Sequence, residues 1–373
     1  MLLKGTDYRL RNILALFGFI MLALVSLINL RNADLYSAKQ FHYAQIVWYL
    51  IGGVMAVLTA KLDIAIFERL AWPIYILSIV LLVAVLLVGV EVNNSQRWLM
   101  VFGLRGQPSE LTKLGLILVL ARFFQRSQQA ERYTLRTLWQ PVLVIVVPAS
   151  LIIIQPDLGT TLALVFVGIS MILFAGVKMR SILALVAIIG VAIPFAWQTD
   201  LILPYQKDRV ALWLNPDQFK WDENRKQRID KSMQPEQALW AVGAGRLTGK
   251  GGGQGSKSRL RSLPEMQTDF VVAAYAEERG FIGCFGLIAL FYLLVAWGAG
   301  VARDARDRFS ALVAIGVSAL IFWQMFMNVG MAVGVLPVVG ITLPFMSYGG
   351  TALITTLVGV GLLFNIALHM QRR

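Results

Sequence analysis

The sequence predicts an all-α polytopic membrane protein of about ten transmembrane helices with one large extracytoplasmic loop. Of its 373 residues, 57% are hydrophobic and only 15% are charged, which is more apolar surface than a soluble fold of this length can bury. The apolar residues also gather in runs of the roughly 20 residues that a helix needs to cross a bilayer. We therefore expect a single integral membrane domain over residues 1–373.

The predicted spans follow these runs in order. Before the long polar stretch they lie at about 11–30, 43–60, 70–90, 109–124, 139–154, 158–176 and 181–198. No cleavage site follows the first run, so we expect it to be a retained helix. The run at 109–124 is the weakest, because it is short and opens with Glu110 and Lys113. After the polar stretch come spans at about 269–300, 309–335 and 343–369.

The lysines and arginines predict the orientation of these spans, because cytoplasmic connections carry an excess of them. With the long polar stretch left out, alternate connections carry sixteen Lys and Arg on one side and four on the other. Both termini are therefore expected in the cytoplasm, and residues 199–268, between spans seven and eight, outside. A helix is expected around Glu236–Gly243 in this loop. The net charge of +13 reflects such clusters and indicates no nucleic-acid partner.

The histidine and cysteine content argues against several kinds of chemistry. Cys284 is the only cysteine in the sequence, so the chain cannot form an internal disulfide. His42 and His369 are the only histidines and lie at span edges. A zinc site of His and Cys ligands and a Ser-His-Asp triad are therefore not expected. Any reaction must use carboxylates, Lys and Arg.

Ionisable residues at membrane depth are the candidate functional groups, because each is costly to bury without a partner or a cavity. Glu110 and Lys113 share a helix face and can form an ion pair. Asp157 lies in a tight turn, where it can cap the next helix, contact a ligand, or both. Asp269 opens a long apolar run. It is either an N-cap or a base that partial desolvation would strengthen.

Three irregular stretches have structural interpretations beside the functional ones. The charge cluster Glu277–Arg279 is expected to satisfy itself inside its span. The glycine-rich run Gly249–Gly255 fails the phosphate-loop pattern and favours a turn or a close backbone approach. The stretch Leu343–Gly350 breaks at a proline at membrane depth, which is tolerated only when it is buried or lines a cavity. Gln324 and Asn328, one turn apart, are expected to bond between helices or to line the same cavity.

Eight segments in matching order carry a resemblance to a known family, namely Gln96–Leu99, Gln107–Lys113, Gln155–Thr160, Leu263–Glu265, Thr268–Phe270, Glu277–Gly283, Asn328–Met331 and Leu336–Gly350. Together they resemble the shape, elongation, division and sporulation (SEDS) family of bacterial cell-wall proteins, and within it the RodA branch. The departures are Gln267 for the usual His, Arg279 for Leu, and Val271–Val272 for Ile-Phe. None removes a charged group that the family mechanism needs.

The resemblance implies a peptidoglycan glycosyltransferase that polymerises lipid II, the undecaprenyl-pyrophosphate-linked disaccharide pentapeptide. It would act at the outer face of the bacterial cytoplasmic (inner) membrane during cell elongation and rod-shape maintenance. The implied partners are a class B penicillin-binding protein, which is a transpeptidase, the elongation machinery and membrane lipid. By the same analogy Asp269 is the catalytic base, and the substrate-binding residues are Glu110, Lys113, Arg97, Asp157, Gln206, Arg209, Thr268 and Ser347.

The implied chemistry suits these residue types. An acceptor hydroxyl attacks the anomeric carbon of the donor as pyrophosphate departs, and Asp269 takes the hydroxyl proton. Pyrophosphate is a good leaving group that needs charge stabilisation, for which Lys113, Arg97 and Arg209 are the candidates. Whether a divalent cation, Mg²⁺ or Mn²⁺, bridges it to Glu110 or Asp157 stays open. No second carboxylate stands out as a nucleophile, so we expect a single displacement with inversion.

Three alternatives remain open at this stage. A lipid II flippase also combines many spans with intramembrane charges, and the Glu277–Arg279 cluster is its best support. A passive scaffold for the transpeptidase would make Asp269 replaceable. Within the enzyme class, the division paralogue FtsW is the near alternative. The short N-terminal tail and Gln254–Ser256 favour the RodA branch.

Overall fold

The structure of the protein is a computed structural model, and it describes residues 8–35, 40–92, 95–101, 104–126, 133–178, 180–184, 190, 198, 204–214, 226–255 and 266–370. Within these residues the helices are α1 (Tyr8–Asp34), α2 (Phe41–Lys61), α3 (Ile64–Val88), α4 (Pro108–Arg126), α5 (Leu135–Ile154), α6 (Leu158–Gly176), α8 (Pro204–Leu214), α9 (Lys226–Gly245), α11 (Val271–Asp304), α12 (Arg308–Ala332) and α13 (Gly350–Met370).

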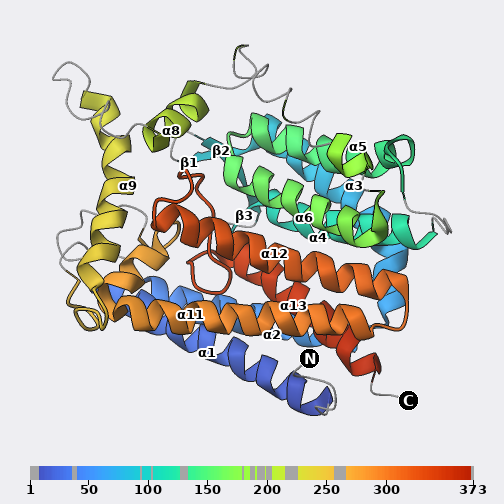
Figure 1. The fold of residues 1–373 in the computed structure, drawn as a ribbon, viewed down its shortest axis with the longest axis horizontal. Coiled ribbons are helices and arrows are strands. Elements are labelled where there is room, and N and C mark those ends of the chain that lie inside the picture. The colour runs from blue at the N-terminus through green and yellow to red at the C-terminus, as the bar shows by residue number, and fades with distance from the viewer. Residues whose placement is uncertain are drawn as a thin grey trace.

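The long helices lie side by side along one direction (Figure 1). Helix α9 crosses one end of this bundle, whereas the start of α1 and the end of α13 lie toward the other end. Eight of the described helices are long and apolar enough to cross a membrane, namely α1, α2, α3, α5, α6, α11, α12 and α13. The predicted polytopic all-α fold is therefore confirmed.

Helix α4 occupies the position of the weakest predicted span and is buried along most of its length. It contacts α3, α5, α6, α12 and α13, so protein surrounds it on nearly all sides. This burial explains its composition. Leu114–Ala121 is apolar all round, and the polar first turn finds partners inside the bundle. The predicted span at 181–198 lies mostly outside the described residues.

Two predicted features change in the structure. The last predicted span, 343–369, begins too early, because α13 starts at Gly350. The preceding backbone is irregular, with Phe345 at a positive φ of 64° next to Pro344, which cannot continue a helical ladder. The connection between α3 and α4 also contains three short antiparallel strands that the sequence analysis did not predict. They pair in the order β1 (Val90–Val92), β2 (Ser95–Val101) and β3 (Leu104–Gly106).

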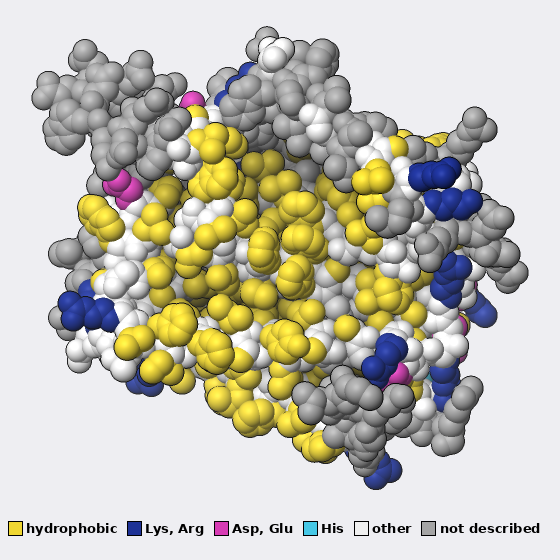
Figure 2. Space-filling model, in the orientation of Figure 1, with side chains coloured by type: hydrophobic (Ala, Val, Ile, Leu, Met, Phe, Trp, Pro, Cys, Tyr) yellow, Lys and Arg dark blue, Asp and Glu magenta, His cyan; other side chains and the backbone are white. Residues whose placement is uncertain are grey.

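The surface of the bundle has the character of a membrane protein. Apolar side chains cover the middle of the helices, whereas Lys and Arg gather toward the ends (Figure 2). Leu50 on α2, Leu87 on α3 and Tyr292 on α11 are each more than 60% exposed. A contiguous apolar surface of this kind marks contact with lipid or with another membrane helix.

Helix α11 is broken at Gly280, whose φ of 64° and ψ of −166° are open essentially only to glycine. The backbone groups that the break releases pair with the residues that follow α9. Phe281 N donates to Arg246 O at 2.8 Å, and Lys250 N donates to Glu277 O at 3.0 Å. Gly249 lies so close to the break that a Cβ there would clash with Glu278 O. The close approach predicted for the glycine-rich run is confirmed.

The charge cluster beside this break is not satisfied internally, so that expectation was wrong. Glu277 is fully buried and pairs with Lys250 at 2.8 Å. Glu278 accepts from Asn32 Nδ2 at 2.7 Å and from Gly253 N at 3.0 Å. The partners come from α1 and from the segment after α9. Periodicity within one helix cannot reveal such partners, because they are distant in sequence.

Gly280→Ala is expected to destabilise the protein by about 2 kcal/mol or more, because the new Cβ meets a forbidden backbone conformation and would clash with Gly249 N. The measurement is the thermal unfolding midpoint of the purified protein in detergent. Gly286→Ala is the matched control on the same helix, since a Cβ there has nothing within 4 Å. Equal midpoints for the two variants would contradict this account of the break.

Candidate active site

Asp269 lies in the turn just before α11 and is half-buried. The turn is tied to residues 333–349, which we call the connecting segment because they join α12 to α13. Asn328, near the end of α12, donates through Nδ2 to Asp269 O at 2.9 Å and to Ile341 O at 2.6 Å. One buried amide therefore holds the backbone of Asp269 to the connecting segment.

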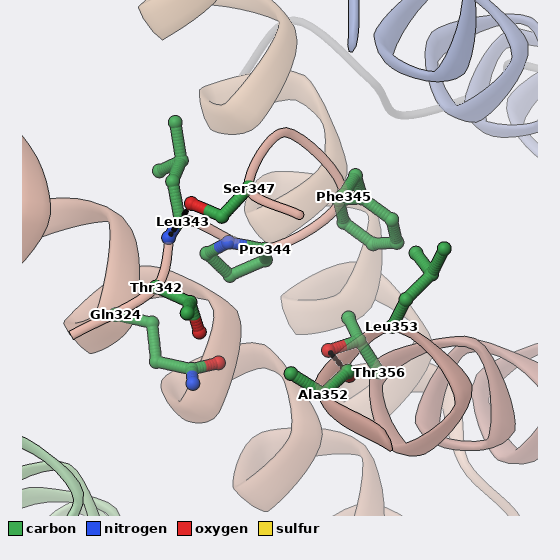
Figure 3. Close-up of a pocket in the computed structure, with 9 residues that line it drawn as sticks. All are labelled: Gln324, Thr342, Leu343, Pro344, Phe345, Ser347, Ala352, Leu353 and Thr356. Carbon is green, nitrogen blue, oxygen red and sulfur yellow. Dashed lines mark hydrogen bonds between the residues drawn. The ribbon is translucent and has the colours of Figure 1, made fainter. Parts of the chain in front are cut away.

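Ser347 makes a second link between the same two pieces of backbone. Its hydroxyl donates to Thr268 O at 2.6 Å and accepts from Leu343 N at 2.8 Å. The side chain is buried and turns back toward Leu343 N (Figure 3). Tyr348 N adds a bond to Gln267 O at 2.8 Å. The bond from Ser347 to the Thr268 carbonyl therefore holds the turn that carries Asp269 against the connecting segment.

Gly340 lies between Asp269 and the start of α6. A Cβ added at Gly340 would sit 3.3 Å from Asp269 Oδ2, and one added at Gly159 would sit 2.7 Å from Gly340 O. Gly340 also has a φ of 72°. Only a residue without a side chain fits here without strain, so the start of α6 approaches Asp269 with one glycine backbone between them.

Asp157, two residues before Gly159, is buried and caps α6 by accepting from Thr160 N at 3.2 Å. Its other oxygen accepts from Gln107 Nε2 at 3.0 Å. Arg97 lies 3.8 Å from the carboxylate and donates to Gln155 O at 3.1 Å and to Pro156 O. The predicted cap is confirmed. Arg97 reaches from β2 to hold the same turn.

Glu110 and Lys113 form the predicted ion pair in the first turn of α4, with Lys113 Nζ 2.8 Å from Glu110 Oε2. The lysine is 2% exposed and the glutamate 5% exposed. The pair joins the Asp157 cluster through Gln107, whose carbonyl accepts from Glu110 N at 3.1 Å. A carboxylate at the start of a helix is also favoured by the helix dipole.

Helix α8 carries the remaining predicted residues, Gln206 and Arg209, and bonds to the connecting segment. Arg209 Nη1 donates to Val338 O at 2.9 Å, two residues before Gly340. Trp213 Nε1 donates to Gly334 O at 3.0 Å. Gln206, one turn before Arg209, is buried. Helix α8 therefore contacts the same segment that faces Asp269.

A small cavity lies beside the site, between α12, α13 and the connecting segment (Figure 3). Its volume is about 10 Å³, enough for about one water molecule and far too small for a sugar. Gln324 and Ser347 line it. Gln324 Oε1 has no hydrogen-bond partner among the described residues. Of the two alternatives expected for this pair, Gln324 lines a cavity, whereas Asn328 bonds to backbone outside its own helix and does not line that cavity.

The two candidate metal ligands are already engaged. Glu110 holds Lys113, and Asp157 holds the start of α6 and Gln107. Over the part of the chain that the structure describes, no three His, Cys, Asp or Glu side chains are grouped to hold a metal ion. The described donor set therefore does not fit a cation at these carboxylates.

All nine predicted site residues therefore lie at or around the connecting segment and the turns before α4, α6 and α11. The sequence analysis missed two contributors. Gly340 lies within the resemblance segment Leu336–Gly350, but its partners, Gly159 and Asp269, are far away in sequence, so no local pattern indicated its role. Gln107 lies within the resemblance segment Gln107–Lys113, directly before α4. That position was the one sequence feature that could have indicated its bond to Asp157.

The fold and this carboxylate-centred site define a polytopic membrane enzyme. The FtsW/RodA/SpoVE family, described as cell cycle protein, matches residues 7–372. The chain belongs to this family, the SEDS family, and is a peptidoglycan glycosyltransferase, as its curated relatives are named.

Relatives and solved structures support this assignment over nearly the full length. The chain is 35% identical over 321 residues to peptidoglycan glycosyltransferase MrdB of Escherichia coli K12, covering 86% of this chain and 84% of the relative. It is 33% identical over 346 residues to the probable peptidoglycan glycosyltransferase FtsW of Trichlorobacter lovleyi, covering 90% and 87%.

Two solved structures show the same fold. Thermus thermophilus rod shape determining protein RodA superimposes with a TM-score of 0.70 at 27% identity, covering 100% of this chain and 99% of that one. A chain described under "Structural coordination of polymerization and crosslinking by a peptidoglycan synthase complex" superimposes with a TM-score of 0.81 at 29% identity, covering 96% and 98%.

Proposed function

We propose that this enzyme polymerises lipid II into glycan strands at the outer face of the bacterial inner membrane, during cell elongation. The observation that carries the proposal is the place of Asp269, half-buried before α11 with Gly340 against its carboxylate. The polar turns before α4 and α6 lie on the other side of that glycine. A membrane-embedded site of this kind suits a substrate whose lipid stays in the bilayer while its sugar reacts at the surface.

Asp269 acts as the general base in the proposed reaction. An acceptor hydroxyl attacks the anomeric carbon of the donor sugar, and Asp269 takes the hydroxyl proton. The new glycosidic bond forms as the bond from the anomeric carbon to the pyrophosphate oxygen breaks, and undecaprenyl pyrophosphate leaves. A single displacement inverts the anomeric carbon.

The leaving pyrophosphate needs positive charge more than it needs a proton donor. Lys113 is the strongest candidate of the three proposed, because its ammonium pairs with Glu110 in the first turn of α4, and Glu110 is joined to Asp157 through Gln107. Arg97 donates to a backbone carbonyl of the turn before α6, and Arg209 donates to a backbone carbonyl of the connecting segment. Each arginine therefore also positions the backbone to which it is bonded. Substrate binding by Thr268 and Ser347 would follow from their bonds at that segment, and substrate binding by Gln206 from its place on α8, one turn before Arg209.

The remaining parts of the proposal concern location and partners. Both termini would lie in the cytoplasm, which fits the start of α1 and the end of α13 lying toward one end of the bundle (Figure 1). A class B penicillin-binding protein within the elongation machinery would cross-link the product. The relative named MrdB favours elongation, whereas relatives named FtsW keep the division role as the second candidate.

Incubating the purified protein with labelled lipid II in detergent micelles tests the proposal. Glycan strands of increasing length on a gel are the expected result, because polymerisation survives in micelles whereas flipping across a membrane has no meaning there. A different pair of results would instead support a flippase. The protein would then make no glycan in detergent but would move lipid II across the membrane once it was reconstituted into vesicles. Complementation of elongation-deficient and division-deficient strains would separate the two cellular roles.

A further inference from the structure

We propose that Asn328 is a positioning residue, which sets the place of the Asp269 carboxylate by joining the backbone of Asp269 to the connecting segment. This inference rests on the proposed role of Asp269 as the base. Asn328 would contact neither sugar nor pyrophosphate, and its effect on the reaction would pass through Asp269.

The contacts of Asn328 are those of a bridge. The residue is fully buried on α12, one turn before the helix ends. Its Nδ2 donates to Asp269 O and to Ile341 O, at 2.9 and 2.6 Å. A primary amide is the neutral side-chain group that offers two donors from one nitrogen, so it can satisfy two carbonyls at once. Neither acceptor lies in the same helix as the donor.

One of the two carbonyls belongs to the base itself, and the other belongs to the residue after the glycine that its carboxylate faces. Ile341 follows Gly340, whose added Cβ would sit 3.3 Å from Asp269 Oδ2. The amide therefore fixes the residue that carries the carboxylate and the residue next to the glycine that the carboxylate faces. A shift of about 1 Å at a reacting group lowers a rate by about 100-fold, so this link has a direct kinetic consequence.

The side-chain oxygen of Asn328, Oδ1, makes no bond to the described part of the chain that would require an asparagine at this position. Asn328 Oδ1 has no hydrogen-bond partner among the described residues, so the contribution runs through Nδ2. In Asn328→Leu both carbonyls lose their donor, while the branched shape and the number of side-chain heavy atoms stay the same. In Asn328→Ser a single shorter donor remains, which can satisfy one carbonyl at most. The two variants therefore grade the loss of the link.

Asn365 offers a matched control for the structural part of this role. It is also a fully buried Asn, and its Nδ2 donates to Thr59 O and Ala60 O at 3.0 and 3.3 Å. These carbonyls belong to the last turn of α2, and Asn365 lies about four turns along α13 from the connecting segment. Asn365→Leu therefore removes the same kind of bond away from Asp269.

The experiment measures kcat, KM for lipid II and the thermal midpoint for Asn328→Leu, Asn328→Ser and Asn365→Leu. Both Leu variants are expected to lower the midpoint. Asn328→Leu should lower kcat by about 10- to 100-fold with KM within about threefold, and Asn328→Ser should lie between it and the wild type. Asn365→Leu should keep kcat within about twofold.

The inference is overturned if Asn328→Leu keeps the wild-type kcat, if it changes KM alone, or if Asn365→Leu loses kcat equally. Should Asn328→Leu fail to fold, a wild-type kcat in Asn328→Ser overturns it as well. Asp269→Ala, assayed in parallel, separates this from the proposed function. An active Asp269→Ala enzyme refutes the base, whereas an inactive one beside a fully active Asn328→Leu enzyme refutes only the positioning role.

Discussion

Asp269→Asn is expected to lower the rate of lipid II polymerisation by about 10²- to 10⁴-fold, the range that general base catalysis contributes. The amide keeps the size of the side chain and can still accept a hydrogen bond, but it cannot take the proton of the attacking hydroxyl. The measurement is the initial rate of glycan formation by the purified variant at saturating lipid II. Affinity for lipid II should change little, because the charge is needed for the chemical step.

Asp304→Asn is the control for this prediction. Asp304 is the last residue of α11, whereas Asp269 lies before its first turn, and Asp304 pairs with Arg11 at 2.9 Å. Because Asp304 lies at the other end of the 34-residue helix α11 from Asp269, this variant should retain activity within about twofold. Wild-type rates in Asp269→Asn would mean that another group takes the proton.

Glu110→Gln is expected to destabilise the protein by about 3–5 kcal/mol, because it leaves the Lys113 ammonium buried without its counter-charge. The lysine is only 2% exposed, so water cannot replace the carboxylate. The thermal midpoint in detergent and the yield of folded protein measure the effect. A midpoint equal to that of the wild type would show that Lys113 finds another partner.

The double variant Glu110→Gln/Lys113→Met separates the structural role of this pair from its catalytic one. Removing both charges avoids the unpaired buried ammonium, so much of the lost stability should return. Polymerisation should nevertheless stay at least about tenfold below the wild-type rate if Lys113 stabilises the leaving pyrophosphate. Full recovery of both stability and rate would make the pair purely structural.

The local predictions were confirmed because the interactions concerned are local. Glu110 and Lys113 meet because residues three apart share a helix face. Asp157 caps α6 because a short acidic side chain before a helix reaches its first free N–H groups. The apolar runs predicted the helices because each must present enough apolar surface to lipid. Helix α4 was the weakest prediction, since protein and not lipid surrounds it.

The wrong predictions concern residues whose partners lie far away in the sequence. The beginning of the last span was placed too early, because the polar groups of residues 343–349 bond to the turn before α11 instead of to a helix. The partners of Glu277 and Glu278 were assigned within the cluster, although they come from Lys250 and Asn32. Such partners are hundreds or tens of residues away, and no periodicity encodes them.

From the sequence alone, one could determine the membrane class, the order of the spans, the family resemblance and the residue types that carry the chemistry. Hydropathy and helix periodicity are properties of neighbouring residues, and they suffice for that. Only the tertiary structure decided that Gly340 separates Asp269 from the start of α6 and that Asn328 joins two distant carbonyls. Buried backbone outside helices must find partners wherever the packed chain supplies them, and packing alone determines which residues those are.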